Sequence, residues 1–254
     1  THGFVEQIGP TNTITRTSRH GDSPLVSTPH ARRRINLDSE EWGDLVDDAD
    51  KVRMLIDPTS SYAQNAGWAF GRTKDDKIIA AATGTALTGH EGTTSVSLPA
   101  AQLVAVDLGG ANEGLTVGKL IAAKSIFGKN DVDEDEQLYM AVTQQQLDDL
   151  LAITEITSAD FNSVRALVKG DIDTFMGFNF KRTQRLSLDA ATDVRTCFAY
   201  VKSGIALGVG RDVKARITER ADKSYSMYVY GAMDVGAARL EEEKVVQILC
   251  DESP

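Results

Sequence analysis

Two glycine-rich stretches contain the residue types that bind phosphate. Gly109-Gly110 is followed by the pair Gly118-Lys119. A phosphate-binding loop has a glycine, four further residues, a Gly-Lys pair and then a hydroxyl residue, so that backbone amides and the lysine surround the phosphate. Here Glu113 stands at the first glycine position and Leu120 at the hydroxyl position. A Gly-x-Gly-x-x-Gly fingerprint is absent as well, so the sequence argues against a nucleotide site here.

An acidic stretch offers oxygen ligands for a cation. Residues 130–136 read N-D-V-D-E-D-E and resemble half of a calcium loop. The mid-loop glycine and the oxygen ligand that follows a five-residue spacer are both missing. The histidines and the distant pair Cys197 and Cys250 also lack the spacing of metal ligands. We expect an acidic turn, two buried thiols, and no metal or other cofactor.

Catalytic constellations are missing from the sequence. It contains no Gly-x-Ser-x-Gly elbow and no His-Glu-x-x-His pair, which present a nucleophilic serine or a zinc ion in known enzymes. Aspartates and glutamates are numerous but occur in runs, which are typical of solvated faces. We expect no enzymatic activity, with an α+β enzyme acting on a small ligand as an alternative.

Length and composition are those of an ordinary globular protein. The 254 residues are 41 % apolar and 25 % charged, which suits one large domain or two small ones. The net charge of −10 argues against attraction of the whole surface to nucleic acid. No apolar run reaches the roughly 18 residues that a membrane helix needs. The chain begins at Thr1, so we expect further residues before it in the natural protein.

The longest predicted element is a helix over Asp57–Ala82. Asp57 is a suitable N-cap, Pro58 suits the first helical position and Gly84 is a suitable stop. The stripe that we expect to face a core comprises Tyr62, Ala66, Ala69 and Phe70. Two glycines lie one turn apart in mid-helix, Gly67 and Gly71. Because each costs about 1 kcal/mol against alanine, we expect a close backbone neighbour there.

The first 37 residues contain few side chains able to form a core. The alternating segment 13–17 predicts a strand, and glycines and prolines interrupt the rest. An isolated hairpin is marginal in water, so this arm must lie on another part of the chain or on a neighbouring subunit. The arm is locally basic, and residues 38–50 after it are strongly acidic. The candidate residues for contact between copies are Arg16, Arg19, Arg32, Arg33, Arg34, Glu40 and Glu41. A solvated charge run is the alternative.

Helices and strands alternate along the rest of the chain. We expect a surface loop at 83–99, a helix over 116–127 capped by Thr116, and shorter helices over 144–153 and 158–170. Strands are expected at 103–106, 138–142, 197–201, 205–209, 213–219, 225–230 and 245–249, and a strand or turn at 175–180. The turn 221–223 joins two of them into a long antiparallel pair.

Taken in this order, the features resemble the major capsid proteins of tailed bacteriophages, which have the Hong Kong 97-type fold. Four stretches carry this resemblance. The first looks like the family's spine helix, the second is similar to its axial domain, and the fourth looks like its peripheral-domain sheet. The stretches are Ile56–Tyr62 with Gly71–Ala82, Gly114–Lys124 with Tyr139–Leu151, Phe161–Gly170 with Gly177-Phe178, and Gly204–Gly208 through Tyr230-Gly231 to Val245–Ile248.

The resemblance implies an α+β fold with an extended β-hairpin loop, a long spine helix, and peripheral and axial domains. Residues 1–40 would be the extended loop, and 41–83 the spine helix with the first part of the peripheral domain. Residues 84–203 would be the axial domain and 204–254 the peripheral-domain sheet. In this family the extended loop lies across an adjacent subunit, which would explain an arm that does not pack on itself. The family's N-terminal arm should precede that loop, and almost nothing precedes it here.

The resemblance also implies a function and a location. We expect a major capsid protein that self-assembles into pentamers and hexamers of an icosahedral shell around double-stranded DNA in the virion, after assembly in the host cytoplasm. Its partners would be copies of itself, portal, scaffolding or decoration proteins, and packaged DNA without sequence-specific contacts, with no membrane. An encapsulin-type compartment shell, which uses the same fold around a protein cargo, is the alternative.

Overall fold

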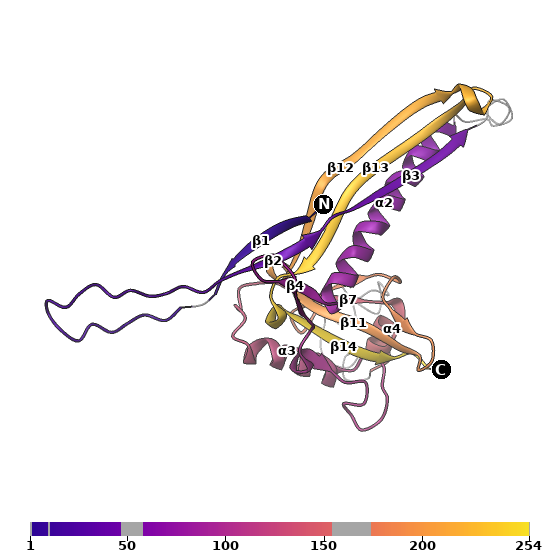
Figure 1. Cartoon of the computed structure of the whole chain (residues 1–254). Helices are drawn as coiled ribbons and strands as arrows, with labels where there is room; N and C mark the ends of the chain where they lie inside the picture. The colour runs from indigo at the N-terminus through magenta and orange to yellow at the C-terminus, as the bar shows by residue number, and fades with distance from the viewer. Residues whose placement is uncertain (1, 10, 47–57, 154–173, 254) are drawn as a thin grey trace.

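The molecule is elongated and has three parts. In Figure 1 a compact body carries the C-terminus, a long sheet with one helix extends from it, and a loop extends in another direction. The computed structural model describes residues 2–9, 11–46, 58–153 and 174–253. Within these ranges the helices are α2 (Pro58–Thr83), α3 (Val117–Lys129) and α4 (Gln144–Ala152), and the strands form three sheets. The predicted α+β class is therefore confirmed.

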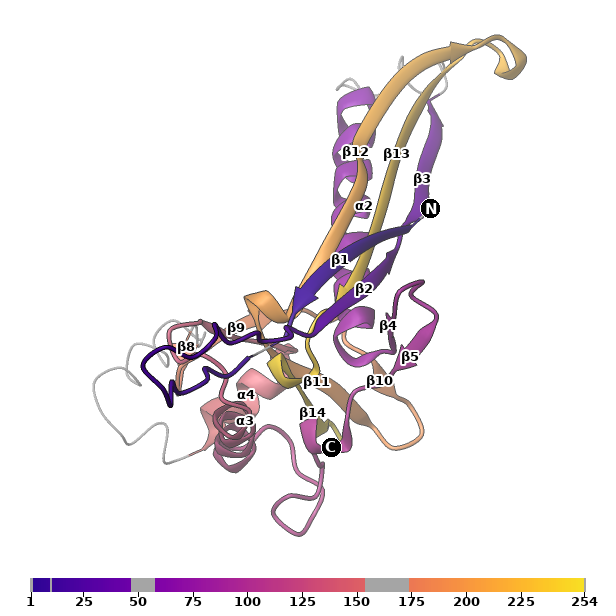
Figure 2. The same ribbon diagram turned by 60° about the vertical axis from the view of Figure 1, so that its left-hand side comes forward.

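The long sheet consists of three antiparallel strands with α2 along one face (Figure 2). Its order is β12 (Ile205–Arg220), β13 (Ser226–Arg239) and β3 (Asp38–Val46), and the 3-10 turn η3 (Ala221–Lys223) joins β12 to β13. The core between helix and sheet consists of Ala66, Phe70, Met233 and Val235, with Trp42 beside them. Ala66 and Phe70 of the predicted stripe thus face this sheet. The predicted pairing of 213–219 with 225–230 is confirmed, and β13 continues beyond it to Arg239.

Helix α2 agrees with the predicted helix to within one residue at each end. The expected N-cap Asp57 lies outside the described residues. At the other end the Gly84 N–H donates to the Ala80 carbonyl oxygen at 3.0 Å, and the helix stops. The expected close neighbour of Gly67 and Gly71 is wrong, because a Cβ built on either glycine would meet no other described atom within 4 Å.

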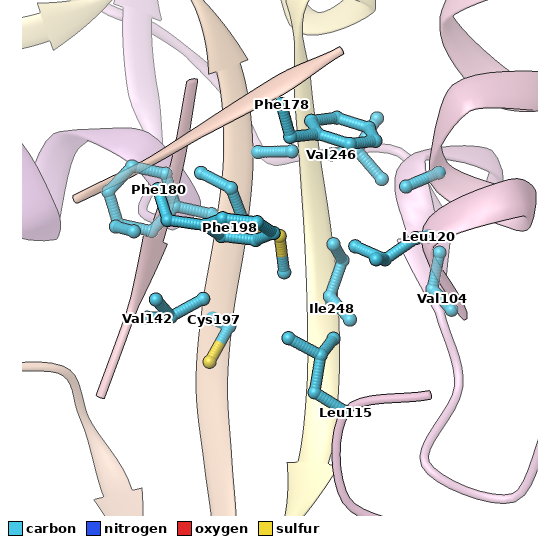
Figure 3. Close-up of a cluster of buried hydrophobic side chains, with 14 of the residues drawn as sticks. Val104, Leu115, Leu120, Val142, Phe178, Phe180, Cys197, Phe198, Val246 and Ile248 are labelled. Atoms are coloured by element: carbon cyan, nitrogen blue, oxygen red, sulfur yellow. The ribbon is translucent and has the colours of Figure 1, made fainter. Parts of the chain in front are cut away.

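A seven-stranded sheet among the described residues forms the centre of the body. Its path is β6 (Leu103–Val104), β14 (Val245–Asp251), β11 (Val194–Val201), β7 (Leu138–Val142), β9 (Phe178–Arg182) and β8 (Thr174–Phe175), with β10 (Leu188–Asp189) beside β11. Figure 3 shows Phe178, Phe198, Leu120 and Ile248 converging in its core. Cys197 and Cys250 are buried free thiols there, as predicted.

Polar caps fix the helices of the body. The Thr116 hydroxyl accepts from the backbone N–H of Lys119 at 3.4 Å, which starts α3 at the predicted cap. Thr143 and Gln146 form a capping box at the start of α4. Short 3-10 turns lie where the chain passes between the body and the other two sheets: η1 (Ala100–Gln102), η2 (Lys202–Gly204) and η4 (Glu242–Lys244).

A four-stranded sheet joins the extended loop to the rest of the molecule. Its order is β1 (His2–Ile8), β2 (His30–Asn36), β4 (Ala86–Thr88) and β5 (Thr94–Val96). Strands β1 and β2 pair antiparallel along their whole length. We call this pair the arm base and residues 11–29 beyond it the arm loop.

Several predicted elements differ from the structure. Residues 11–29 contain no strand. The predicted strand over 13–17 would have a single apolar side chain, Ile14, which is too little to hold it against another element. Residues 38–46 form strand β3, in which Asp38, Glu41 and Asp44 are exposed. The expected loop at 83–99 contains the β4–β5 hairpin, which extends the sheet of the arm base. The helix expected over 158–170 lies outside the described residues.

The last strand belongs to a different sheet from the one expected. The sequence groups residues 204–254 into a single sheet, but β14 pairs with β11 and β6 in the body. Val245, Val246, Ile248 and Cys250 are all buried in the body core. A strand that is apolar on both faces needs cover on both sides, and the central sheet of the body supplies that cover.

Candidate assembly surfaces

The arm loop is the most exposed part of the described chain. The Gly9 N–H donates to the Pro29 carbonyl at 2.9 Å and closes its base. Among the described residues, the side-chain hydrogen bonds of the loop stay within it, from the Arg16 guanidinium to the carbonyls of Ser18 and Arg19. Leu25 is 94 % exposed and Ile14 is 58 % exposed. Apolar side chains on a segment that leaves its own body (Figure 1) make the loop a candidate contact surface.

The three consecutive arginines of the arm base have different environments. Arg32 forms an exposed ion pair with Glu6 at 2.7 Å and lies over the Phe4 ring. Arg34 packs its aliphatic stem against the turn at Gly92. Arg33 is 7 % exposed and its Nη2 atom lies 2.6 Å from the Glu242 carboxylate of the same chain. Side chains two residues apart in a strand lie on the same face, so Arg33 lies on the face of β2 that carries the buried Ile35, and Arg32 and Arg34 lie on the other face.

The acidic candidates lie on β3, away from the arm loop. Glu40 pairs with Lys77 of α2 at 3.1 Å, and Asp38 pairs with the same ammonium group at 2.6 Å. Glu41 accepts a hydrogen bond from the Tyr230 hydroxyl, which raises the pKa of Tyr230. The structure therefore spreads the seven candidate residues over the arm loop, the arm base and β3. Within one subunit, Arg16, Arg32, Arg33, Glu40 and Glu41 all have partners in their own chain.

The distal half of the β12–β13 pair is a second exposed surface, which the sequence analysis does not identify. None of the described strands pairs with the outer edge of β12. Val213, Ile217 and Tyr225 are exposed there. Alternation of apolar and polar residues predicted strands here. Which edge of β12 stays unpaired depends on the order of the strands in the sheet, which the alternation does not specify. Open backbone donors and acceptors beside apolar side chains are typical of edges that pair with another chain.

A third exposed feature lies on α2, on the side away from the long sheet. Trp68 is 65 % exposed. Gly67 precedes it and Gly71 follows one turn later, both with open space above them. A large aromatic side chain beside bare helix backbone is a surface that another chain could cover.

The residues of the glycine-rich stretch have a structural role. Lys119 is fully buried, and its amine donates to the carbonyls of Glu113 at 2.5 Å and Leu249 at 2.9 Å. Burial lowers the pKa of Lys119. An amine enclosed in this way is not available to a phosphate. Across the ranges that the structure describes, no three His, Cys, Asp or Glu side chains are placed to hold a metal ion, and no helix is long and apolar enough to cross a membrane.

Comparisons with known proteins agree with the fold. The sequence matches the phage capsid protein family over residues 1–252. No curated protein matches it. Similar solved structures include the capsid of the cyanophage P-SCSP1u, which is 18 % identical with a TM-score of 0.73 and matches 99 % of this chain and 84 % of its own. The capsid of Ralstonia phage GP4 is 8 % identical with a TM-score of 0.71 and matches 100 % and 84 %. Mycobacterium phage Che8 is 18 % identical with a TM-score of 0.62 and matches 97 % and 84 %.

These likenesses show the fold, which is the Hong Kong 97-type fold of phage capsid structures. The chain belongs to the phage capsid protein family. It is a major capsid protein that forms the shell of the virion. This membership favours a phage shell over an encapsulin-type compartment.

Proposed function

We propose that this capsid subunit assembles into hexamers and pentamers of an icosahedral shell that encloses double-stranded DNA, and that it has no enzymatic activity. Each arm loop would lie across a neighbouring copy. Assembly would take place in the host cytoplasm, with portal, scaffolding or decoration proteins as further partners. In this assignment the arm base and loop are the extended loop, α2 with the long sheet is the peripheral domain, and the body with β14 is the axial domain.

The single observation that carries the proposal is the exposed arm loop. Burying a leucine or isoleucine side chain such as Leu25 or Ile14 is worth about 1.5–3 kcal/mol. That stabilisation is lost while the loop lies free, as it does in the subunit. A second copy that covers the loop would recover it. Arg16 and Arg19 carry the positive charge of the loop, and the subunit as a whole is acidic, so charge also favours contact with another copy.

The net charge also bears on the contents of the shell. A subunit with a net charge of −10 has little general attraction for a polyanion. Such a shell would enclose DNA without sequence-specific contacts. Particles isolated from their natural source should therefore contain double-stranded DNA, and a protein cargo in its place would favour the encapsulin-type alternative.

Electron microscopy of the purified full-length chain and of a loop variant tests the proposal. The variant replaces residues 11–28 by a short glycine linker that keeps β1 and β2 paired. We expect closed shells from the full chain, whereas the variant should unfold at the same temperature as the full chain and remain unassembled. Shells from the variant, formed as readily as from the full chain, would contradict docking through the arm loop.

A further inference from the structure

The turn between β13 and β14 lies where the three sheets meet. It comprises Arg239, Leu240, Glu241 and Glu242, and we call it the 239–242 turn. In Figure 1 the arm base, β4 and the ends of α2 and β13 converge there. The Leu240 N–H donates to the Gly204 carbonyl at 2.8 Å, which joins the turn to the start of β12.

The arm base is bound to this turn through both of its strands. The Leu240 carbonyl accepts from the Gln7 side chain of β1 at 2.8 Å and from Arg33 Nε of β2 at 2.8 Å. Arg33 Nη2 donates to both oxygens of the Glu242 carboxylate, at 2.8 and 2.6 Å. The arm base also pairs with β4 in the four-stranded sheet, and these long-range bonds add a second attachment, to the turn.

The same turn is bound to the end of α2. Arg239 is 0 % exposed, and its Nη1 atom donates to the carbonyls of Ala82 at 3.0 Å and Gly84 at 2.6 Å. Its Nη2 atom donates to the Val96 carbonyl of β5 at 3.2 Å. Carbonyls at a helix C-terminus lack partners within the helix and carry partial negative charge, so they suit a buried guanidinium.

Glu242 lies between the two buried guanidinium groups. One of its oxygens is 2.6 Å from Arg33 and the other is 3.7 Å from Arg239. Arg33 Nη1 and Arg239 Nε are buried without a hydrogen-bond partner among the described residues. Burial lowers the pKa of Arg239, and the Glu242 carboxylate opposes that change. Without this carboxylate, two desolvated cations would face each other with nothing between them.

We propose that Glu242 is a positioning residue that fixes the direction in which the arm leaves the body. Its carboxylate lies between Arg33 of the arm base and Arg239 of β13, which is hydrogen-bonded to the end of α2, so the arm and the body keep one relative orientation. The importance of that orientation for assembly rests on the proposed docking of the arm loop onto a second copy. A fixed arm loses less conformational entropy when it docks than a free one.

The test measures the direction of the arm in the unassembled full-length chain. Spin labels on Ile8→Cys, at the end of the arm base, and Ser125→Cys, on α3, report the distance between arm and body. Both positions are exposed, and the natural Cys197 and Cys250 are fully buried and escape labelling. We expect a single narrow distance peak in the labelled parent. Glu242→Gln should broaden or split this peak, whereas Glu243→Gln, the same change on the exposed neighbour, should leave it narrow.

A second variant keeps the test decisive if Glu242→Gln does not fold. Arg33→Gln removes the tie on the arm side but leaves Glu242 paired with Arg239, so the subunit should fold and its peak should broaden. When both changes are combined, the broadening should be no greater than with Arg33→Gln alone. A narrow peak in Arg33→Gln, or in a folded Glu242→Gln variant, would overturn the role of Glu242. The distance is measured on the unassembled chain, so a narrow peak would not contradict the proposed docking of the arm. In the same way, failure of the chain to assemble would not contradict the measured distances.

Discussion

Glu252 shows how individual side chains hold the end of the body in place. Its carboxylate accepts two hydrogen bonds from Arg195, at 2.9 and 2.7 Å, and one from Gln146 at 2.8 Å. The hydrogen bonds from Arg195 lower the pKa of Glu252, with Gln146 and Thr143 contributing further. Because the folded pKa lies below the unfolded value, this stabilisation is present above the unfolded pKa, which is about 4.3 for glutamate. It is lost as pH falls through the folded pKa.

We therefore expect the free energy of unfolding of the unassembled subunit to fall in acid, and Glu252→Gln to reduce that fall. At neutral pH the variant should be less stable by about 2 kcal/mol, the scale of hydrogen bonds to a charged group. The difference should shrink below the folded pKa. Urea unfolding over a pH series measures it, with the exposed Glu134→Gln as control. An equal loss of stability at every pH would exclude the ionisation of Glu252 as the cause.

A second prediction at this scale concerns Lys119. Its buried stem fills the body core, and its pKa is lowered by burial. Lys119→Ala leaves a cavity and should destabilise the subunit by about 3 kcal/mol. Lys119→Met fills the space without a buried charge and should stay within about 1 kcal/mol of the parent. Urea unfolding of both variants measures the difference, and equal losses would show that the amine is essential to the fold.

Individual residues also show what the sequence does and does not specify. The cap Thr116 was predictable because its role is local. The run Arg32-Arg33-Arg34 suggested three equivalent surface charges, yet Arg33 is buried against Glu242. Strand alternation with the neighbouring Ile35 was the signal that could have separated Arg33 from the other two. Its partner lies more than 200 residues away, and no local pattern identifies such a pairing.

Among the elements, α2 carries a prediction that follows from its two glycines. Gly67→Ala and Gly71→Ala should each stabilise the unassembled subunit by about 0.5–1 kcal/mol, because alanine has the higher helix propensity and nothing described lies within 4 Å of the added Cβ. Thermal unfolding measures the gain. Gly231→Ala is the contrasting control, since its Cβ would lie 2.7 Å from the Phe70 ring and should destabilise.

The same glycine variants also test the exposed side of α2. If the gain in stability comes with poorer assembly, the strip beside Trp68 contacts another copy. Normal assembly with a gain in stability would leave the two glycines without a role in that contact. Lower stability in both variants would contradict the open space above them.

Elements were predicted better than their pairing. Periodicity identified α2, α3, α4, β7 and the distal part of the β12–β13 pair, because each has its own apolar pattern, but it did not predict β13 beyond residue 230. It did not identify the sheet to which β14 belongs. The apolar run Val245-Val246 and Ile248-Leu249-Cys250, with one polar residue in it, is typical of a strand covered on both sides. That pattern points to the body, but sequence order placed β14 after β13.

For the molecule as a whole, the sequence predicts an arm without a core of its own but not the surface that receives it. Poor self-packing is visible in composition, because few residues of the arm can be buried. In the proposed assembly the receiving surface would lie on another copy, and its distance and orientation would have no counterpart in the pattern of a single chain. From the residues alone, the arm could lie on its own chain or on a neighbouring subunit. The resemblance to phage capsid proteins favours the neighbouring subunit.

The final prediction concerns the charge of the arm loop. Arg16→Glu with Arg19→Glu should slow assembly, and most strongly at low salt, because solvent-exposed charges are screened beyond about 8 Å at physiological ionic strength. Lys129→Glu with Lys202→Glu, two exposed residues of the body, changes the net charge equally and controls for general repulsion between acidic subunits. Light scattering during assembly at low and high salt measures the rates. If both double variants slow assembly equally, the effect belongs to net charge and not to the arm. If only the arm variant is slow and high salt restores its rate, the loop docks through Arg16 and Arg19.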